Sequence, residues 1–224
     1  AYQTQRMAVF YMLDPMATGM IPGYVKRIWN ENPDLDPQFT QRDLAWIKAN
    51  TIDFISFSYY RSAVYAKDAE MTSNTGGIKG KDNPYLSECS PEPWSWPVDP
   101  KGLRYTMNVL YDRYHLPLFI VENGIGLDET PDENDIIDDS FRVHYLKEHL
   151  LQVHEAILDG VECLGYLWWG PIDIVSAGTG EMKKRYGFIY VDRHNDGTGT
   201  LERKKKMSFD SFKAIIESNG DILL

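Results

Sequence analysis

One acidic residue, Glu122, stands where a buried strand is predicted to end and a polar turn to begin. The apolar run 116–121 precedes it, and Asn123-Gly124-Ile125-Gly126 follows it. Short apolar runs bounded by turn residues are typical of strands in a parallel sheet. A carboxylate at such a strand end is costly to bury without partners, and ligands of parallel α/β folds bind at this edge. Glu122 is therefore a candidate catalytic carboxylate, with a structural carboxylate beside a basic neighbour as the alternative.

The tetrapeptide Val121-Glu122-Asn123-Gly124 resembles the nucleophile motif of family 1 glycoside hydrolases. In that family the Glu attacks the anomeric carbon of a β-glycoside. The resemblance implies that Glu122 is the catalytic nucleophile. Four residues alone are a weak signal, but the similarity extends along nearly the whole chain.

A second segment, residues 53–60, is similar to the sixth barrel strand of that family. Tyr60 matches the tyrosine that hydrogen-bonds the nucleophile, and a phenol that donates to a carboxylate fixes its orientation and favours its charged form. Without the resemblance, Tyr60 is an ordinary aromatic residue at a strand end. Ser58 stands where the family commonly has Asn, which is a departure at a position that contacts the nucleophile or the sugar.

Residues 168–186 carry the best indication of the substrate. Trp168 matches the tryptophan that stacks on the sugar at the cleavage subsite, and we place Trp169 beside it among the substrate-binding residues. Plain β-glucosidases of the family continue with a Glu-Trp pair that binds the outer sugar hydroxyls, whereas this chain has Ser176 and Ala177 there. A carboxylate would repel a phosphate, but a serine hydroxyl can donate to one.

Lys184 and Tyr186 complete, together with Ser176, the phosphate site of the 6-phospho-β-glucosidase subgroup. The resemblance therefore implies a β-linked 6-phosphoglucoside as the substrate. The run 183–185 is basic in an otherwise acidic chain, and without the resemblance such a short run is interpreted as solvated surface. Residues 178–179 lie in the same turn as Ser176, so several hydroxyls and amides are candidates for the phosphate contact.

The second carboxyl of a retaining glycosidase is missing from the predicted site. Such enzymes need an acid/base carboxyl about 5–5.5 Å from the nucleophile. In family 1 it lies in an Asn-Glu-Pro motif after the fourth barrel strand, earlier than any segment matched here. The segments 30–33 (Asn-Glu-Asn-Pro) and 91–93 (Pro-Glu-Pro) resemble this motif, but neither follows a predicted strand. We expect the chain to hold the nucleophile and the phosphate site without the acid/base Glu, and to be inactive alone.

Composition limits the other function classes. The net charge of −10 argues against nucleic acid as a partner, and the isolated basic run 203–206 is interpreted as solvated. No apolar run approaches the roughly 20 residues that cross a bilayer. The histidines and cysteines lack metal-ligand spacing, and the reaction that the resemblance implies requires no metal or organic cofactor. Cys89 and Cys163 lie in different sequence contexts and form no disulfide pattern, which indicates a reduced, cytoplasmic protein.

The rest of the chain supplies elements that position these residues. Strands are predicted at 52–60, 116–122 and 161–169, and a β-hairpin at 185–206. Helices are predicted at residues 3–19, 23–30, 40–50, 101–114, 140–159 and 208–218, with Pro15 expected to kink or end the first. Residues 61–100 are interpreted as a long loop that ends in an aromatic wall, 93–97, which places Trp96 among the substrate-binding residues.

Strands that alternate with helices imply parallel βαβ units with right-handed crossovers. A (β/α)8 barrel needs eight strands, and this chain supplies about three. We predict an α/β fold in which residues 1–224 form the C-terminal part of a single TIM-barrel catalytic domain. Residues 1–5 contain neither an initiator Met nor a signal-peptide pattern, so the chain is expected to begin inside a longer domain.

Two partners follow from an incomplete barrel: the N-terminal part of the barrel, or a second copy of this chain. The phosphorylated β-glucoside is the expected small-molecule partner. A non-catalytic half-barrel that binds a phosphosugar or a partner chain without turnover is the alternative function. An Asn-Glu-Pro motif upstream of Ala1 in the reading frame would favour the enzyme.

Overall fold

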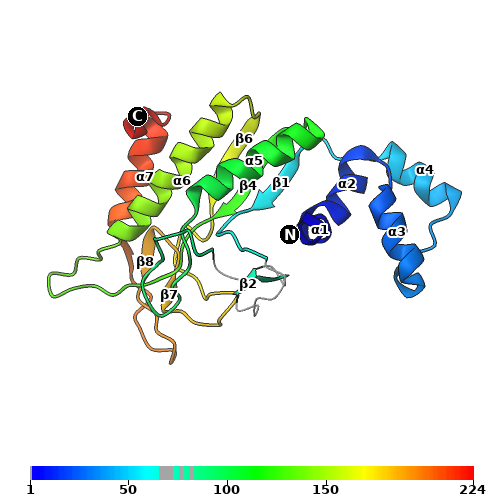
Figure 1. The fold of residues 1–224 in the computed structure, drawn as a ribbon. Helices are drawn as coiled ribbons and strands as arrows, with labels where there is room; N and C mark the ends of the chain where they lie inside the picture. The colour runs from blue at the N-terminus through cyan, green and yellow to red at the C-terminus, as the bar shows by residue number, and fades with distance from the viewer. Residues whose placement is uncertain (1, 66–72, 76–77, 81–82) are drawn as a thin grey trace.

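A three-stranded parallel sheet lies at the centre of the computed structural model, which describes residues 2–65, 73–75, 78–80 and 83–224 (Figure 1). Its strands are β1 (Ile55–Ser58), β4 (Leu118–Asn123) and β6 (Cys163–Trp168), in the order β1-β4-β6. The three predicted strands are confirmed with shorter bounds. The flanking residues leave the ladder, as Ile52 does by donating its backbone N–H to the Met16 carbonyl.

Two helices, α5 (Pro100–Tyr114) and α6 (Ser140–Leu158), pack together against one face of this sheet (Figure 1). Leu118 and Ile120 of β4 are fully buried under them because alternate residues of a strand point to the same face. Phe119 points to the opposite face, where Gly165 leaves room for its ring: a Cβ there would lie 2.9 Å from the ring. The helix layer therefore covers one face of the sheet.

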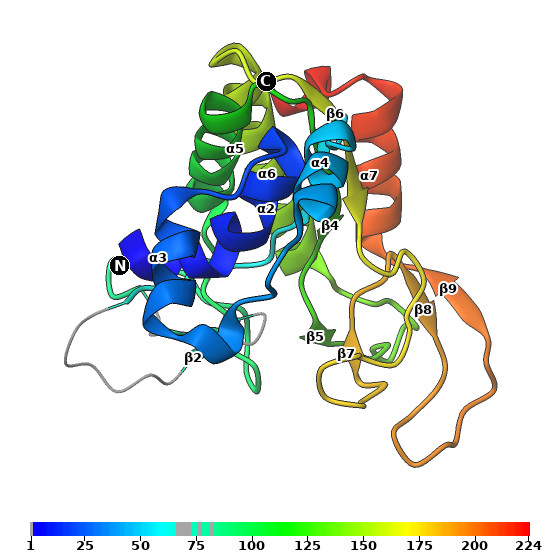
Figure 2. The ribbon, with the colours of Figure 1, turned by 90° about the vertical axis from the view of Figure 1, so that its right-hand side faces the viewer.

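The first fifty residues form a separate group of helices beyond β1 (Figures 1 and 2). The elements are α1 (Tyr2–Gln5), a π-helical turn (Arg6–Phe10), α2 (Tyr11–Thr18), α3 (Gly23–Glu31), a 3-10 turn (Pro33–Leu35) and α4 (Gln41–Ala49). The predicted start of α4 is confirmed, because Thr40 and Asp43 form a reciprocal capping box.

Pro15 does not end the first helical segment, which continues to Thr18 and stops at the left-handed Gly19. The proline removes one backbone hydrogen bond. Its neighbour Asp14 compensates, because this buried carboxylate accepts hydrogen bonds from Arg113 and Tyr114 of α5 at 2.6–2.7 Å. Tertiary contacts therefore hold a turn that the sequence alone predicts to be weak.

Short antiparallel pairs lie beyond the carboxyl ends of the central strands (Figure 2). One pair joins β5 (Leu127–Asp128) to β7 (Lys184–Arg185), and another joins β8 (Ile189–Val191) to β9 (Arg203–Lys205). The predicted hairpin is therefore present only at 189–205. Assigning Arg185 to it was wrong, because Arg185 pairs with Leu127 of β5 and residues 186–188 lie in no strand.

The remaining elements are α7 (Met207–Glu217), a final 3-10 turn (Asp221–Leu223) and the antiparallel pair β2 (Ser73–Thr75) and β3 (Ile78–Gly80). The pair β2–β3 lies inside the segment 61–100, so that segment is not entirely a loop. Part of the segment (66–72, 76–77 and 81–82) lies outside the described residues. The other predicted helices are confirmed to within one or two residues.

The basic run 203–206 is not uniformly solvated, contrary to the prediction. Lys206 is fully buried at the start of α7, where its ammonium lies 2.6 Å from Glu129 and 3.0 Å from Asp173. Lys204 pairs with Asp135 at the surface. The backbone N–H of Lys206 bonds to the Phe188 carbonyl one step beyond the β8–β9 ladder, and its side chain falls on the same side as Lys204 because side chains alternate.

Candidate active site

The carboxylate of Glu122 lies at the carboxyl end of β4, beside the end of β1. Its Oε2 accepts hydrogen bonds from the Ser58 and Tyr60 hydroxyls, each at 3.0 Å. The parallel register makes Ser58 and Glu122 direct partners, which explains how side chains more than sixty positions apart meet. The serine therefore supplies a hydroxyl contact to this carboxylate at the position where family members commonly have Asn.

Burial, followed by the charge of Glu122, raises the pKa of Tyr60 far above its ordinary range. Tyr60 therefore stays protonated and can donate. Both hydroxyls bond the same carboxylate oxygen, Oε2. The other oxygen, Oε1, accepts no hydrogen bond from the residues that the structure describes. That oxygen can face a substrate.

Asn123, which sequence reasoning did not single out, fixes the two strand ends to each other. Its Nδ2 donates to the Tyr59 carbonyl at 2.7 Å, and its Oδ1 accepts from Tyr166 at 2.5 Å. Tyr145 of α6 donates to the Tyr60 carbonyl at 3.0 Å. Asn123 and Tyr145 are both fully buried, so the position of Tyr60 relative to Glu122 is held from the helix side. The Val-Glu-Asn-Gly motif contained the signal, because an Asn that follows a buried strand needs partners.

Trp168 faces the helix layer. Its indole N–H donates to the Tyr186 carbonyl at 2.7 Å, its ring lies 4.9 Å from Phe188, and only 7% of the residue is exposed. Trp168 and Asn123 are register partners on that side. A register shift between Ile120 and Asn123 brings Asn123 to the helix side, so Glu122, one residue before it, points to the opposite face. Trp169 directly follows Trp168 and donates its backbone N–H to the Asn123 carbonyl, so its side chain also points away from the helices. This register favours Trp169 over Trp168 for a stacking contact, and both roles stay predictions.

Trp96 lies between the carboxylate and the basic residues. Its ring packs edge-on against Tyr60 at 6.1 Å, and the Lys184 ammonium lies 4.2 Å from the ring centroid. Trp94 is the second indole at this ammonium, at 5.0 Å. The predicted aromatic wall therefore borders the candidate site.

Lys184 is a buried cation with an unusual environment. None of the ion pairs within the described ranges includes it, whereas the neighbouring Lys183 lies 3.9 Å from Asp128 and 4.0 Å from Glu181. Burial and then the nearby charge of Arg61 lower the pKa of Lys184. A buried cation surrounded by indoles favours an anionic ligand, because an anion would offset the cost of its burial.

Ser176, Lys184 and Tyr186 are brought together, as the sequence predicted. All three are buried, and Ser176 lies close enough to Tyr186 to affect the pKa of its phenol. Burial raises the pKa of Tyr186, while Ser176 and the charge of Arg142 oppose that rise. Gly126 touches the cluster from the turn after Glu122: a Cβ there would lie 2.7 Å from Lys184 Cγ and 2.9 Å from Tyr186 Cζ. The three residues therefore lie next to the turn that follows Glu122.

Other kinds of site receive little support. In the described ranges, no group of three His, Cys, Asp or Glu side chains is arranged to hold a metal ion. None of the helices there combines the length and the apolar character that crossing a bilayer requires. Both cysteines are unpaired. The cytoplasmic location predicted from them stays a prediction.

The family model of glycosyl hydrolase family 1 matches residues 1–221. The chain belongs to this family. It is 48% identical over its full length to the aryl-phospho-β-D-glucosidase BglH of Bacillus subtilis and 50% identical over 99% of its length to a 6-phospho-β-glucosidase of Clostridium longisporum. It covers 47% of each. This family 1 chain therefore spans about half the length of the curated relatives it matches.

Solved structures agree on the fold. A β-glucosidase from Thermotoga maritima in complex with noeuromycin superimposes with a TM-score of 0.78 over 98% of the family 1 chain and 47% of its own, at 24% identity. Another structure of a family 1 β-glucosidase from Thermotoga maritima gives a TM-score of 0.77 over 97% of the family 1 chain and 46% of its own, at 24% identity. The predicted fold, part of a (β/α)8 barrel, is thereby confirmed.

Proposed function

We propose that this chain is the C-terminal part of a retaining 6-phospho-β-glucosidase, and that it carries the nucleophile and the phosphate site. The buried Lys184 carries the proposal, because it has hydroxyls and indoles around it but no carboxylate within ion-pair distance in the described ranges. The names of the curated relatives support the same substrate class. Residues 1–224 would then belong to one catalytic domain.

In the proposed reaction, Glu122 Oε1 attacks C1 of the phosphoglucoside and forms a covalent glycosyl ester. The bond from C1 to the leaving oxygen breaks, and that oxygen takes a proton from the acid. Water then attacks C1 with help from the same group acting as base, which frees Glu122 and retains the configuration. Ser58 and Tyr60 hold the other carboxylate oxygen so that the attacking one is aimed.

The acid is proposed to lie on the rest of the barrel. Glu31 ends the exposed helix α3 and pairs with Arg27, and Glu92 is exposed in a loop. We call this chain together with the remaining strands of the barrel, on one polypeptide or two, the complete barrel.

The phosphate assignment is tested by Lys184→Ala in the complete barrel. Loss of a charge-assisted hydrogen bond to phosphate costs roughly 1.5–3 kcal/mol, or about 10- to 150-fold in KM. We expect that increase for a chromogenic 6-phospho-β-glucoside and little change for its unphosphorylated counterpart. Steady-state kinetics on both substrates measure it.

Lys183→Ala is the matched control, because it removes the same charge one residue away from a side chain paired with Asp128 and Glu181. It should change either KM by about twofold or less. An equal effect of Lys184→Ala on both substrates, or a wild type that prefers the unphosphorylated sugar, would refute the phosphate site.

Gly126→Ala is expected to damage the same site from the other side. The added methyl would overlap Lys184 Cγ and the Tyr186 ring, which must move. We expect KM for the phosphorylated substrate to rise about 10-fold, since a charge-assisted bond is misplaced rather than deleted. Gly23→Ala, at the start of the distant helix α3 where a Cβ meets nothing within 4 Å, is the control. Equal kinetics of the two variants would contradict the contact.

A further inference from the structure

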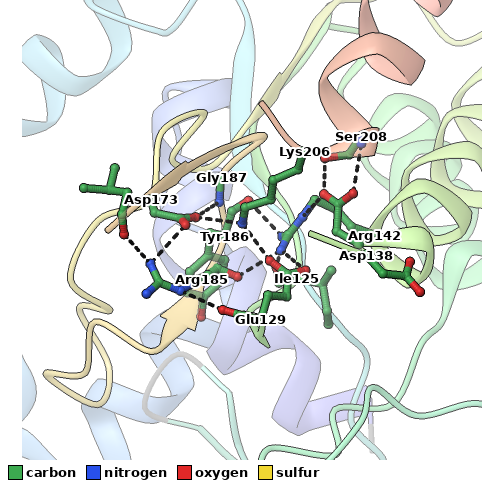
Figure 3. A network of polar contacts seen from close by, with 12 residues as sticks. Ile125, Glu129, Asp138, Arg142, Asp173, Arg185, Tyr186, Gly187, Lys206 and Ser208 are labelled. Atoms are coloured by element: carbon green, nitrogen blue, oxygen red, sulfur yellow. Dashed lines mark hydrogen bonds and ion pairs between the residues drawn. The ribbon is translucent and has the colours of Figure 1, made fainter. Parts of the chain in front are cut away.

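A buried network of ions lies directly behind the phosphate-site strand β7 (Figure 3). Its cations and carboxylates alternate, and each is at most 6% exposed: Arg142, Arg185, Lys206, Glu129, Asp139 and Asp173. Burial raises the pKa of Glu129 and lowers that of Lys206, so each ion depends on its partners to stay charged. The proposed reaction uses none of these groups.

Arg142 occupies the centre of this network. It is 0% exposed, and its Nη1 donates to the carbonyls of Ile125 at 2.7 Å and Tyr186 at 2.9 Å (Figure 3). Its remaining nitrogens reach the Arg185 carbonyl and two carboxylates, Glu129 at 2.6 Å and Asp139 at 3.1 Å. One planar guanidinium therefore holds segments sixty positions apart in the sequence.

The two carbonyls belong to the two halves of the candidate site. Ile125 lies in the turn that follows Glu122, directly before Gly126. Tyr186 is the tyrosine of the proposed phosphate site. A rigid link between them fixes how far the phosphate-binding groups lie from the carboxylate that attacks C1.

Stability alone is a poor explanation for such a network. Replacing buried ion pairs by apolar residues is often neutral or stabilising, so a buried network need not be kept for stability. The planar, forked guanidinium instead supplies fixed geometry, which an ammonium cannot. Fixed geometry matters here because remote binding energy accelerates a reaction only if it holds the reacting atoms in position.

We propose that Arg142 is a positioning residue, which sets the distance between the nucleophile and the sugar-phosphate site through the Ile125 and Tyr186 carbonyls. The proposal rests on the proposed function. It states that phosphate binding contributes to kcat through this link, in addition to its contribution to affinity through Lys184.

Arg142→Lys in the complete barrel tests the link. Lysine keeps a positive charge beside Glu129 and Asp139, but its three N–H groups cannot replace all the bonds that the guanidinium makes to three carbonyls and two carboxylates. We expect kcat for the 6-phospho-β-glucoside to fall about 10- to 100-fold with KM nearly unchanged, because Lys184 still binds the phosphate. For the unphosphorylated counterpart, kcat/KM should change by less than about threefold. Lys184→Ala gives the opposite split between kcat and KM, so failure of this proposal is distinguishable from failure of the proposed function.

Ser208→Ala is the matched control. It removes a buried hydrogen bond from Asp139 in the same network but leaves the carbonyl bonds of Arg142 intact. We expect a lower Tm and an unchanged ratio of kcat between the two substrates. Arg142→Gln is the second substitution and should act in the same direction as Arg142→Lys.

Three outcomes would overturn the positioning role. Equal losses of kcat on both substrates in the Arg142 variants would show a general structural role. The same conclusion would follow if Ser208→Ala changed the ratio of kcat between the two substrates as much as the Arg142 variants do. Failure of both Arg142 variants to fold, judged by circular dichroism, would show that the network serves to hold the fold. A selective fall in kcat that Ser208→Ala does not share supports the proposal.

Discussion

Replacing Glu122 with Gln in the complete barrel should lower kcat for the 6-phosphoglucoside by about 10³-fold or more, which corresponds to at least about 4 kcal/mol of barrier. The amide is nearly the same size, so the hydroxyls of Ser58 and Tyr60 keep an acceptor and the fold is expected to persist. What is lost is the nucleophile, because a neutral amide does not form the glycosyl ester. Steady-state kinetics of the two proteins measure the effect.

Glu162→Gln is the control, since Glu162 is exposed and directly precedes β6 at the opposite end of the sheet. It should retain normal kinetics. Azide should restore turnover to Glu122→Gly, because the small anion can occupy the emptied space and form the bond to C1 itself, leaving a glycosyl azide of inverted configuration. Near-normal activity of Glu122→Gln would remove Glu122 from the mechanism.

The 224-residue chain by itself should not hydrolyse the phosphoglucoside and should associate in solution. Its three-stranded sheet has two open edges, β1 and β6, and helices α5 and α6 cover only one face. On the face that carries Phe119, the side chain of Leu167 is 50% exposed. Parallel sheets are stable when both faces are covered. Light scattering should therefore report a mass above that of the monomer, or aggregation.

Adding the N-terminal part of the barrel should abolish the association and produce hydrolysis. Leu167→Gln should weaken self-association, whereas Ile157→Gln, on α6 with a similar 48% exposure, should not. A monomeric chain that hydrolyses the substrate unaided would contradict both the fold boundary and the location of the acid. A complete barrel that binds the phosphosugar without turnover would instead favour a non-catalytic module.

Local chemistry in the sequence determined most of the elements. The capping box at Thr40 and Asp43, the end of α6 just before Gly160 and the apolar run that ends at Glu122 are each specified by residues close together in the sequence. Such signals depend on propensity, capping and periodicity, which act over a few residues. The resemblance then supplied candidate roles for Glu122, Tyr60 and Lys184.

Only the tertiary structure decided which side chains meet. Ser58 keeps a hydroxyl on Glu122 because a bulge in β1–β4 makes the two register partners, and a shift of one residue would turn either away. The alternation of side chains in β6 likewise directs Trp168 toward the helices and favours Trp169 for the predicted stacking contact on the other face.

Burial of charge was equally invisible in the sequence. Lys206 and Arg142 look like ordinary surface residues, yet both are buried among carboxylates contributed by distant segments. Here the cost of burying each cation is offset by carboxylates that come from elsewhere in the chain. The identity of those partners depends on how strands pair and helices pack, which no local pattern encodes.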